Sequence, residues 1–292
     1  MSGHLRQQQE GVFAPLPEMD DGQYAQWNRL LERRTGMCLP PERRSFLVTN
    51  VGLRMREIGC GSYQEYYDLV RDGVRGRREW ATLVDRLTVH ETRFFRHPQA
   101  LELVREYAAA KRPEVPGAAV SIQGWSAGCA TGEEAYSLAM VVDQALLGRS
   151  GPSYYGVVAT DISPPALARA RQGRYRPERV GELEPAVRRR YFEEEEDGTL
   201  RVVDWLRRRV CFARMNIFHH ERHPMGPMDF IYCQNVLIYF DRARRVELVT
   251  GLVQYLVPGG LLVLGSGDVV GWNHPQLEKI HNRDVLAWRR VA

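Results

Sequence analysis

The sequence predicts an α/β protein in which a domain with a Rossmann-like, doubly wound sheet follows a small all-helical domain. Three observations predict this fold class. Apolar residues recur at helical spacing from Asp21 to about Val89, strands alternate with helices after Pro116, and a run of small residues joins the first of these strands to a helix. The 292 residues suffice for one large domain or two smaller ones.

The N-terminal third divides into a tail, a helical domain and a linking segment. Residues 1–21 are polar, contain glycine and proline and show no hydrophobic period, so we expect a disordered tail. In residues 22–89 the apolar residues follow a helical period, and glycines and prolines divide the segment into short helices. Residues 90–117 are expected to form a linker that contains a helix.

Residues 118–292 are expected to form the sheet domain. The expected strands are residues 118–123, 154–160, 228–233 and 261–264, and the expected helices are 133–147, 164–172 and 242–256. A last strand, 285–289, is expected to close the sheet at one edge. The alternation predicts a parallel sheet that binds its ligand at the carboxyl ends of the strands.

One stretch of the sheet domain breaks the alternation. Between residues 190 and 213, three short strand-like segments flank the acidic turn 193–198. This pattern predicts a small antiparallel β-subdomain inserted into the sheet domain, available to a partner.

Composition excludes several classes of protein. The net charge is only +4, with acids interspersed among the arginines, which fits a mixed surface better than a nucleic-acid-binding one. No apolar run approaches the roughly 18 to 20 residues of a membrane span, and the first residues lack the apolar stretch of a secretory signal, so we expect a cytoplasmic protein. Five scattered cysteines without a CxxC pair support neither a disulfide framework nor a metal site.

The strongest local signal is the segment AVSIQGWSAGCATGEEAYSLAM, residues 119–140. Small residues after its strand let a nucleotide-like ligand approach the backbone, but the spacing is neither GxGxxG nor that of a P-loop. Thr131 and Glu134 have the T-x-x-E spacing of a helix capping box, which leaves a purely structural interpretation open. However, acidic residues repel a dinucleotide phosphate and attract a cationic sulfonium, which favours S-adenosylmethionine as cofactor.

Three further polar residues are candidates for the same site. Asp161 follows the second strand, where such sheets place an acid against ribose hydroxyls, although an aspartate before a helix is also a common N-cap. Asn235 lies just past another strand and could bond a cofactor or close its own turn. Arg96 could orient a carboxylate through two hydrogen bonds.

Taken together, these segments resemble the CheR family of chemotaxis receptor methyltransferases, in order and from about Asp21 to Ala292. The matching motifs are Thr92-x-Phe94-Phe95-Arg96, Trp125-Ser126-Ala127-x-x-x-Thr131-Gly132-Glu133-Glu134-x-Tyr136-Ser137, Ala159-Thr160-Asp161-Ile162, Asn216, and Asn235-Val236-x-Ile238-Tyr239-Phe240-Asp241. The resemblance implies a Rossmann-like S-adenosylmethionine methyltransferase domain with an inserted β-subdomain, preceded by a helical domain that contacts the receptor.

The resemblance also implies the site residues. The cofactor site is expected to be lined by His90, Thr92, Arg96, Glu134, Asp161, Asn216, Ile217, Asn235 and Val236. Arg96 and Tyr239 are expected to border the methyl group and to orient the incoming carboxylate. His90 stands where some members have Asn, and Gln234 stands where Arg commonly precedes the Asn.

The implied activity is methyl esterification of glutamate side chains on a chemotaxis receptor or a receptor-like signalling protein, with S-adenosylhomocysteine as product. The β-subdomain lacks the glycine-bearing loop of members that grip a receptor's C-terminal peptide, so we expect no such tether to be required. Two alternatives stay open. One is a methyltransferase with another acceptor, and the other is a non-catalytic docking or sensor module that binds S-adenosylmethionine.

Overall fold

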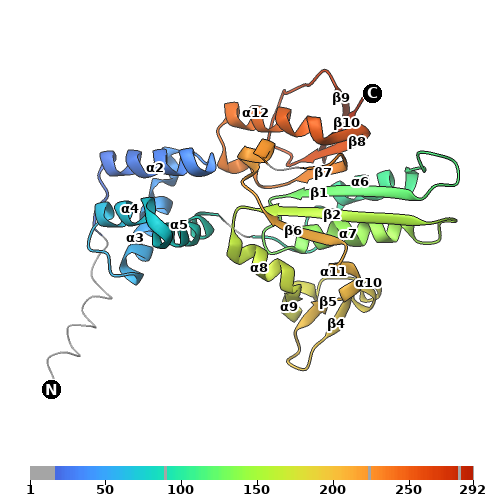
Figure 1. The fold of residues 1–292 in the computed structure, drawn as a ribbon, viewed down its shortest axis with the longest axis horizontal. Helices are drawn as coiled ribbons and strands as arrows, with labels where there is room; N and C mark the ends of the chain where they lie inside the picture. The colour runs from blue at the N-terminus through green and yellow to red at the C-terminus, as the bar shows by residue number, and fades with distance from the viewer. Residues whose placement is uncertain (1–16, 89–90, 223–224, 282–283, 292) are drawn as a thin grey trace. The chain divides into compact units, whose positions relative to one another are not determined.

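The computed structural model describes residues 17–88, 91–222, 225–281 and 284–291 (Figure 1). The chain divides into two units, Met1–Val89 and His90–Ala292. In the part of the chain that is described, none of the helices has the length and apolar character needed to span a membrane.

The first unit is all helical. Its elements are α2 (Asp21–Thr35), η1 (Pro41–Arg43), α3 (Arg44–Glu57), α4 (Tyr63–Arg71) and α5 (Gly73–Leu87). Helix α2 begins with a capping box, in which Asp20 accepts from the Gln23 amide and the Gln23 side chain accepts from the Asp20 amide. It ends at Gly36, whose φ of 79° is the left-handed conformation that glycine adopts without strain.

The core of this unit encloses a polar network. The Arg54 guanidinium donates two hydrogen bonds, of 2.6 and 2.8 Å, to the two oxygens of Glu79, and the Tyr66 hydroxyl donates to the same carboxylate at 2.8 Å. Glu79 and Tyr66 are buried. Because every oxygen of the carboxylate has a donor, the network ties α3, α4 and α5 together without an unpaired buried charge.

The expected disordered tail is wrong for residues 17–21. Met19 is buried, the Pro17 carbonyl accepts from the Tyr63 hydroxyl at 3.1 Å, and α2 already begins at Asp21. A single apolar side chain within a polar stretch was too weak a signal to reveal this packing. Residues 1–16 lie outside the described residues.

The second unit contains a large and a small sheet. Its elements are α6 (Pro98–Ala110), β1 (Val120–Ala127), α7 (Glu133–Leu146), β2 (Ser153–Asp161), α8 (Pro164–Gln172), β3 (Arg174–Tyr175), α9 (Pro177–Val180), α10 (Pro185–Tyr191), β4 (Phe192–Glu194), β5 (Leu200–Val202), α11 (Asp204–Arg207), β6 (Val210–Arg214), η2 (Ile217–Arg222), β7 (Met228–Cys233), η3 (Leu237–Tyr239), α12 (Arg242–Leu252), η4 (Val253–Tyr255), β8 (Leu256–Leu264), β9 (Leu277–Ile280) and β10 (Leu286–Arg290).

The large sheet has the order β6-β2-β1-β7-β8-β10-β9. Neighbouring strands from β6 to β8 are parallel, which confirms the Rossmann-like fold class, whereas β10 is antiparallel to both β8 and β9. The expected last strand therefore does not close the sheet at its edge: β10 lies one strand inside, and β9 forms the edge. Only residues 281–285 separate β9 from β10, which is too short for the crossover that a parallel pair needs.

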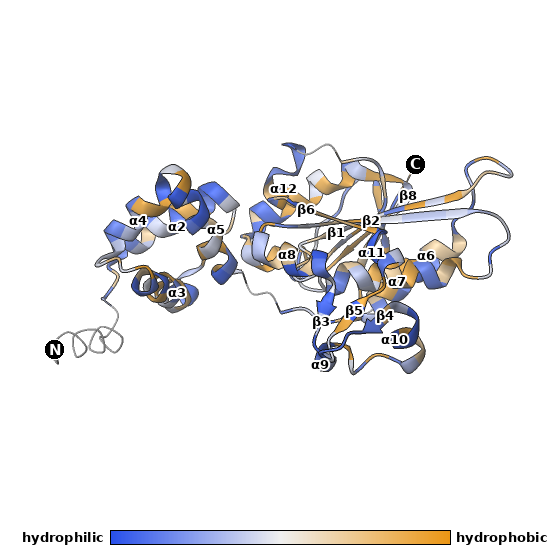
Figure 2. Ribbon diagram, turned by 60° about the horizontal axis from the view of Figure 1, so that its bottom comes forward, coloured by the Kyte–Doolittle hydropathy of each residue, from blue (hydrophilic) through white to orange (hydrophobic). Residues whose placement is uncertain are grey.

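Apolar side chains fill the space between the sheet and its helices. Figure 2 shows α6 and α7 on one face and α12 on the other. All six residues of β7 are buried, as expected for a central strand covered on both faces. The Phe230 ring of β7 lies so close to β1 that a Cβ atom at Gly124 would come within 2.0 Å of it, so this position of β1 requires glycine.

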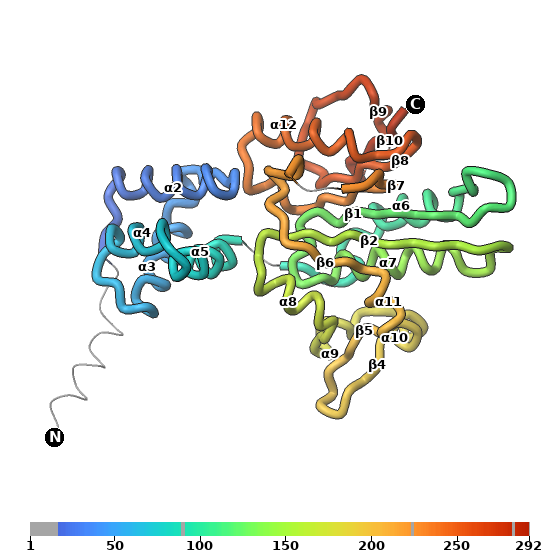
Figure 3. Tube along the Cα trace, in the orientation of Figure 1, coloured from blue at the N-terminus to red at the C-terminus, as the bar shows by residue number. Residues whose placement is uncertain are grey.

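The small sheet differs in its bounds from the expected insertion of residues 190–213. The chain leaves the large sheet after α8, forms a sheet of order β3-β5-β4, and returns as β6 (Figure 3). The insertion thus starts earlier, at Arg174, and the segment expected as its last strand is β6, which pairs with β2 in the large sheet. The strands of the small sheet have only two or three residues, too few to show an alternating pattern.

One carboxylate fixes the insertion to the main domain. Asp143 of α7 accepts from the Tyr191 hydroxyl at 2.9 Å, from Arg190 at 2.8 Å and from the Tyr155 hydroxyl at 3.2 Å. Tyr191 is fully buried. The end of α10 is therefore held against α7 and β2.

A second carboxylate, Asp229 at the start of β7, joins three elements. One of its oxygens accepts from the Tyr107 hydroxyl and from Lys111, each at 2.7 Å, and the other accepts from the Gln123 amide at 2.8 Å. Asp229 is buried, Tyr107 lies in the last turn of α6, and Lys111 is the C-cap residue of that helix. This group links α6, β1 and β7.

We expect Asp229→Ala to destabilise the protein by about 3 kcal/mol, because it leaves a buried hydroxyl and a largely buried ammonium group without their acceptor. Urea denaturation followed by circular dichroism measures the change. Glu182→Gln, which removes only an exposed ion pair with Arg93, should change stability by less than about 0.5 kcal/mol. Equal unfolding midpoints for the two variants would contradict the role of Asp229.

Candidate active site

The carboxyl ends of the central strands meet at one edge of the large sheet. The register pairs Ala127 of β1 with Thr160 of β2, and Asp161 of β2 with Arg214 of β6. From β1 the chain continues to β2 on one side, whereas β7 lies on the other side, so the strand order reverses between β1 and β7. Ligands of doubly wound sheets bind at such a reversal.

The loop after β1 is held against the end of β2. The amides of Gly128 and Cys129 both donate to the Thr160 carbonyl, at 2.8 and 2.9 Å. The amide of Ala130 donates to a carboxylate oxygen of Asp161 at 2.8 Å. These bonds fix the path of the loop.

Asp161 also shapes the turn that follows β2. Its other carboxylate oxygen accepts from the Ser163 amide at 2.9 Å, and the Ser163 hydroxyl is the N-cap of α8. Asp161 is buried and is not itself the N-cap. The N-cap interpretation of Asp161 is therefore wrong, and its carboxylate lies between the loop after β1 and the turn after β2.

The capping-box alternative for Thr131 and Glu134 is also wrong. Helix α7 begins after Gly132, whose φ is 98°, and no side chain caps it. The Thr131 hydroxyl donates to Glu133 at 2.6 Å, while Glu134 accepts from the Ser126 hydroxyl of β1 at 2.7 Å. Glu134 is thus oriented by the strand and not by its own helix.

Burial raises the pKa of the Glu134 carboxyl to about 8, and the nearby charge of Asp161 adds to this effect. The Ser126 hydrogen bond and the positive charge of Arg96 act in the opposite direction. Burial likewise raises the pKa of Glu133, against the hydrogen bond from Thr131. Burial thus raises the pKa of both glutamates at the start of α7, and a positive charge brought near them would favour their ionised forms.

The segment with Arg96 and the segment after β7 meet at this edge. The Asn235 side-chain nitrogen lies 3.1 Å from Nε2 of His97. Val236 packs against the loop after β1, since a Cβ atom at Gly128 would lie 2.1 Å from a Val236 methyl group. Arg96 is half-buried and donates to the Glu91 carbonyl.

Three residues other than glycine have a positive φ in the described part of the chain, and all three lie in these loops. They are Phe95 (51°), Ala130 (46°) and Asn235 (61°). Left-handed backbone is unfavourable for residues with a Cβ and concentrates at functional sites. These unfavourable backbone conformations therefore lie in the three loops that carry Phe95, Ala130 and Asn235.

The other predicted site residues lie along the same strand ends. Asn216 and Ile217 follow β6, where Met215 donates its amide to the Asp161 carbonyl at 3.0 Å. Tyr239 is buried at the end of η3, and its amide donates to the Val236 carbonyl at 3.2 Å.

Thr92 is buried, and its carbonyl accepts from Arg179 at 2.7 Å. The remaining predicted residue, His90, lies outside the described residues.

Four residues that support the site escaped sequence reasoning. Ser126 orients Glu134, and His97 contacts Asn235. Ser137 accepts from the Phe95 amide at 3.0 Å, and Arg179 bonds the Thr92 carbonyl. The sequence motifs contain Ser126 and Ser137, and His97 directly follows one of them. Arg179 is 87 residues from its partner Thr92, and no sequence pattern around it indicates this contact.

The polar side chains at the strand ends suit a cationic organic cofactor. Two carboxylates, a hydroxyl and an amide side chain converge at the strand ends, where they can neutralise an ammonium group and bond ribose hydroxyls. Among the described residues, no group of three or more His, Cys, Asp or Glu side chains could hold a metal ion.

Comparison with known proteins agrees with a site for a cationic organic cofactor. The family model described as the SAM binding domain of CheR methyltransferase matches residues 90–286, and the model of the all-alpha domain of CheR methyltransferase matches residues 22–88. The chemotaxis protein methyltransferase of Escherichia coli (strain K12) is 31% identical over 253 residues, which cover 86% of this chain and 85% of that protein. That of Vibrio parahaemolyticus is 33% identical over 260 residues, which cover 86% and 90%.

The chemotaxis protein methyltransferase of Salmonella typhimurium is 29% identical over 274 residues, 92% of each chain. Family models thus account for both units, and relatives match over most of their own length. The chain belongs to the CheR methyltransferase family, and its cofactor is S-adenosylmethionine.

Proposed function

We propose that this protein transfers a methyl group from S-adenosylmethionine to glutamate side chains of a chemotaxis receptor or a receptor-like signalling protein, in the cytoplasm. The relatives named as chemotaxis protein methyltransferases support the acceptor class. The observation that carries the proposal is the arrangement of Glu134 and Asp161 beside Arg96 at the strand reversal. The acids favour a cationic donor, and the arginine favours an anionic acceptor.

The cofactor site is proposed to be built from the strand ends. Glu134 and Asp161 would hold the positively charged and hydroxyl-bearing parts of the cofactor. The other proposed lining residues are His90, Thr92, Arg96, Asn216, Ile217, Asn235 and Val236. When bound, the cofactor supplies a methyl group on a positively charged sulfur.

The protein's own task in this reaction is positioning. A glutamate carboxylate with an ordinary pKa of about 4.3 is already ionised at neutral pH, so no general base is needed. Holding the attacking oxygen in line with the methyl group can contribute roughly 7 to 11 kcal/mol to the lowering of the barrier. We assign this task to Arg96, whose planar guanidinium matches a carboxylate, and to Tyr239.

Arg96→Ala and Tyr239→Phe should each lower kcat for methyl transfer about 10- to 100-fold, because each removes a donor that orients the carboxylate. For Tyr239→Phe the affinity for S-adenosylhomocysteine should stay within twofold of the unchanged protein. Initial rates with radiolabelled cofactor provide the measurement. Tyr154→Phe, which changes an exposed tyrosine of β2, is the matched control. Full activity of both test variants would show that these roles are wrong.

Binding of S-adenosylhomocysteine should release protons at pH 7. Since the pKa of Glu134 is about 8 in the free protein, its carboxyl is mostly protonated at pH 7. The ammonium group of the ligand stabilises the carboxylate and lowers that pKa, so a proton leaves on binding. Calorimetric titrations in two buffers of different ionisation enthalpy count the released protons.

We expect a release of up to about one proton for the unchanged protein and close to none for Glu134→Gln. Glu178→Gln, an exposed acid of α9, should behave like the unchanged protein. Equal proton release in all three proteins would remove Glu134 from the cationic site.

The acceptor is tested by incubating the full-length protein with radiolabelled S-adenosylmethionine and a cytoplasmic receptor fragment. A glutamate ester is cleaved by mild base, so base-labile label on the receptor supports the proposal. Base-stable label indicates another acceptor group, and tight cofactor binding without transfer to any receptor indicates a non-catalytic sensor. A fragment without its C-terminal peptide should be labelled at an equal rate if no tether is required.

A further inference from the structure

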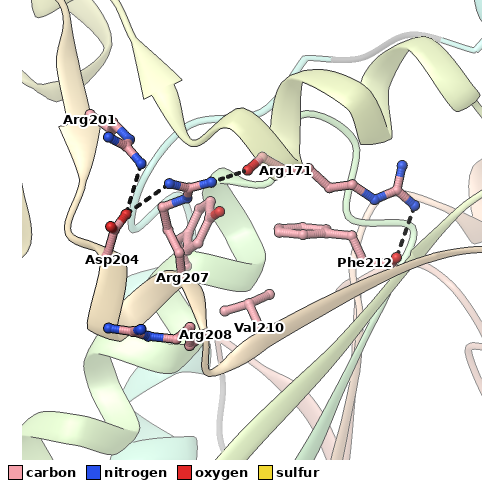
Figure 4. A pocket seen from close by; sticks show the side chains of 8 residues that line it. Arg171, Arg201, Asp204, Arg207, Arg208, Val210 and Phe212 are labelled. Atoms are coloured by element: carbon pink, nitrogen blue, oxygen red, sulfur yellow. Dashed lines mark hydrogen bonds and ion pairs between the residues drawn. The ribbon is translucent and has the colours of Figure 1, made fainter.

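A hollow of about 440 Å³ lies apart from the strand reversal, between the insertion and the edge of the large sheet. Figure 4 shows its charged lining, which comes from α8, β5 and α11 with its C-cap residue. Four arginines and one acid face it, namely Arg171, Arg201, Arg207, Arg208 and Asp204. None of the proposed cofactor-site residues lines it.

The charges around this arginine hollow are unbalanced. Asp204 accepts from Arg201 at 2.8 Å and from Arg207 at 2.9 Å, so a single carboxylate serves two guanidinium groups. The Arg208 side chain makes no ion pair or hydrogen bond with any residue that the structure describes. The terminal nitrogens of Arg207 donate to Asp204 and, at 3.0 Å, to the Arg171 carbonyl. The Arg208 guanidinium is therefore the group for which an anion entering the hollow would supply an acceptor.

The sequence around the hollow also contains more arginines than acidic residues. Residues 164–214 contain thirteen arginines and nine acidic residues, an excess of four, which equals the net charge of the whole chain. The acids of the insertion concentrate in the turn 193–197, away from the lining of the hollow. The insertion and its flanking elements therefore carry a net positive charge, which favours the approach of anions.

The hollow also has an apolar wall. Val210 is buried, Phe212 is half-buried, and Figure 4 shows the Phe212 ring between Arg207 and Arg171. An aromatic ring flanked by guanidinium groups is a surface on which a flat heterocycle stacks. The volume lies within the range of about 300 to 1,000 Å³ that small-molecule sites occupy, and it exceeds the needs of a bare inorganic anion.

We propose that this arginine hollow binds a nucleotide, whose phosphate is held by Arg201, Arg207 and Arg208 and whose base lies against Phe212. Guanidinium groups bind phosphate oxygens in pairs of hydrogen bonds, which supplies the acceptor that the Arg208 side chain lacks. The site is separate from the one that holds S-adenosylmethionine, and it does not depend on the acceptor of the methyl group. An acidic peptide would use the charges but would leave the aromatic wall without a specific role.

The test is calorimetric titration of guanosine 5′-monophosphate into the full-length protein saturated with S-adenosylhomocysteine, so that the cofactor site is closed to the added ligand. We expect saturable binding of one equivalent, about 10-fold or more weaker binding of inorganic phosphate, and none of guanosine. Arg201→Gln and Arg208→Gln should each weaken binding about 5- to 20-fold. Arg208→Gln is the safer variant for folding, because Arg208 is exposed and supports no other residue.

Arg169→Gln is the matched control, since it removes one positive charge from an exposed position of the same α8 outside the hollow. Its affinity should equal that of the unchanged protein. The proposal is overturned by the absence of saturable heat, by an equal loss of affinity in Arg169→Gln, or by inorganic phosphate binding as tightly as the nucleotide. Displacement of the nucleotide by an equimolar glutamate-rich peptide would likewise overturn it, by assigning the hollow to acidic peptides.

Discussion

The carboxylate of Asp161 fixes the geometry on which the cofactor site depends. One oxygen binds the amide of Ala130 in the loop after β1, and the other binds the amide of Ser163 ahead of α8. Two loops from neighbouring strands are thus held by one side chain at the point where the strand order reverses. Because the loop after β1 leads directly into α7, its fixed path also determines where Glu134 stands. A buried acid therefore acts here both on backbone structure and on the electrostatics of the site.

Much of the architecture was predictable because the hydrophobic period is local. The central strands and the helices α7, α8 and α12 have long enough apolar patterns to be read directly. The ordered motifs also identified the segments that converge at the strand reversal. The position of β10 was not predictable in this way, since the pairing of a strand depends on the whole sheet and not on its own residues. The bounds of the insertion failed for a related reason, because strands of two or three residues show no period.

The site residues were likewise only partly predictable from the sequence. Asp161 and Glu134 were recognisable as acids at strand and helix ends, but the sequence alone left structural alternatives for both. Only the fold shows that Ser163 caps α8 and that Glu134 turns toward Ser126 of β1. The contact of Arg179 with Thr92 joins segments distant in the sequence, and no local pattern reports it. Electrostatic consequences, such as the raised pKa of Glu134, follow from burial that only tertiary structure provides.

Strand β7 has two ends of different character. At its beginning, Asp229 binds donors from α6 and β1, and just past its end Asn235 adopts a left-handed backbone beside His97. The anchoring contacts and the proposed cofactor contact are thus separated by the length of one strand. An exchange of the residues that follow the strand would therefore alter the proposed cofactor site, while the anchored end preserves the register. Diversification within this architecture is expected to accumulate on one side of the sheet.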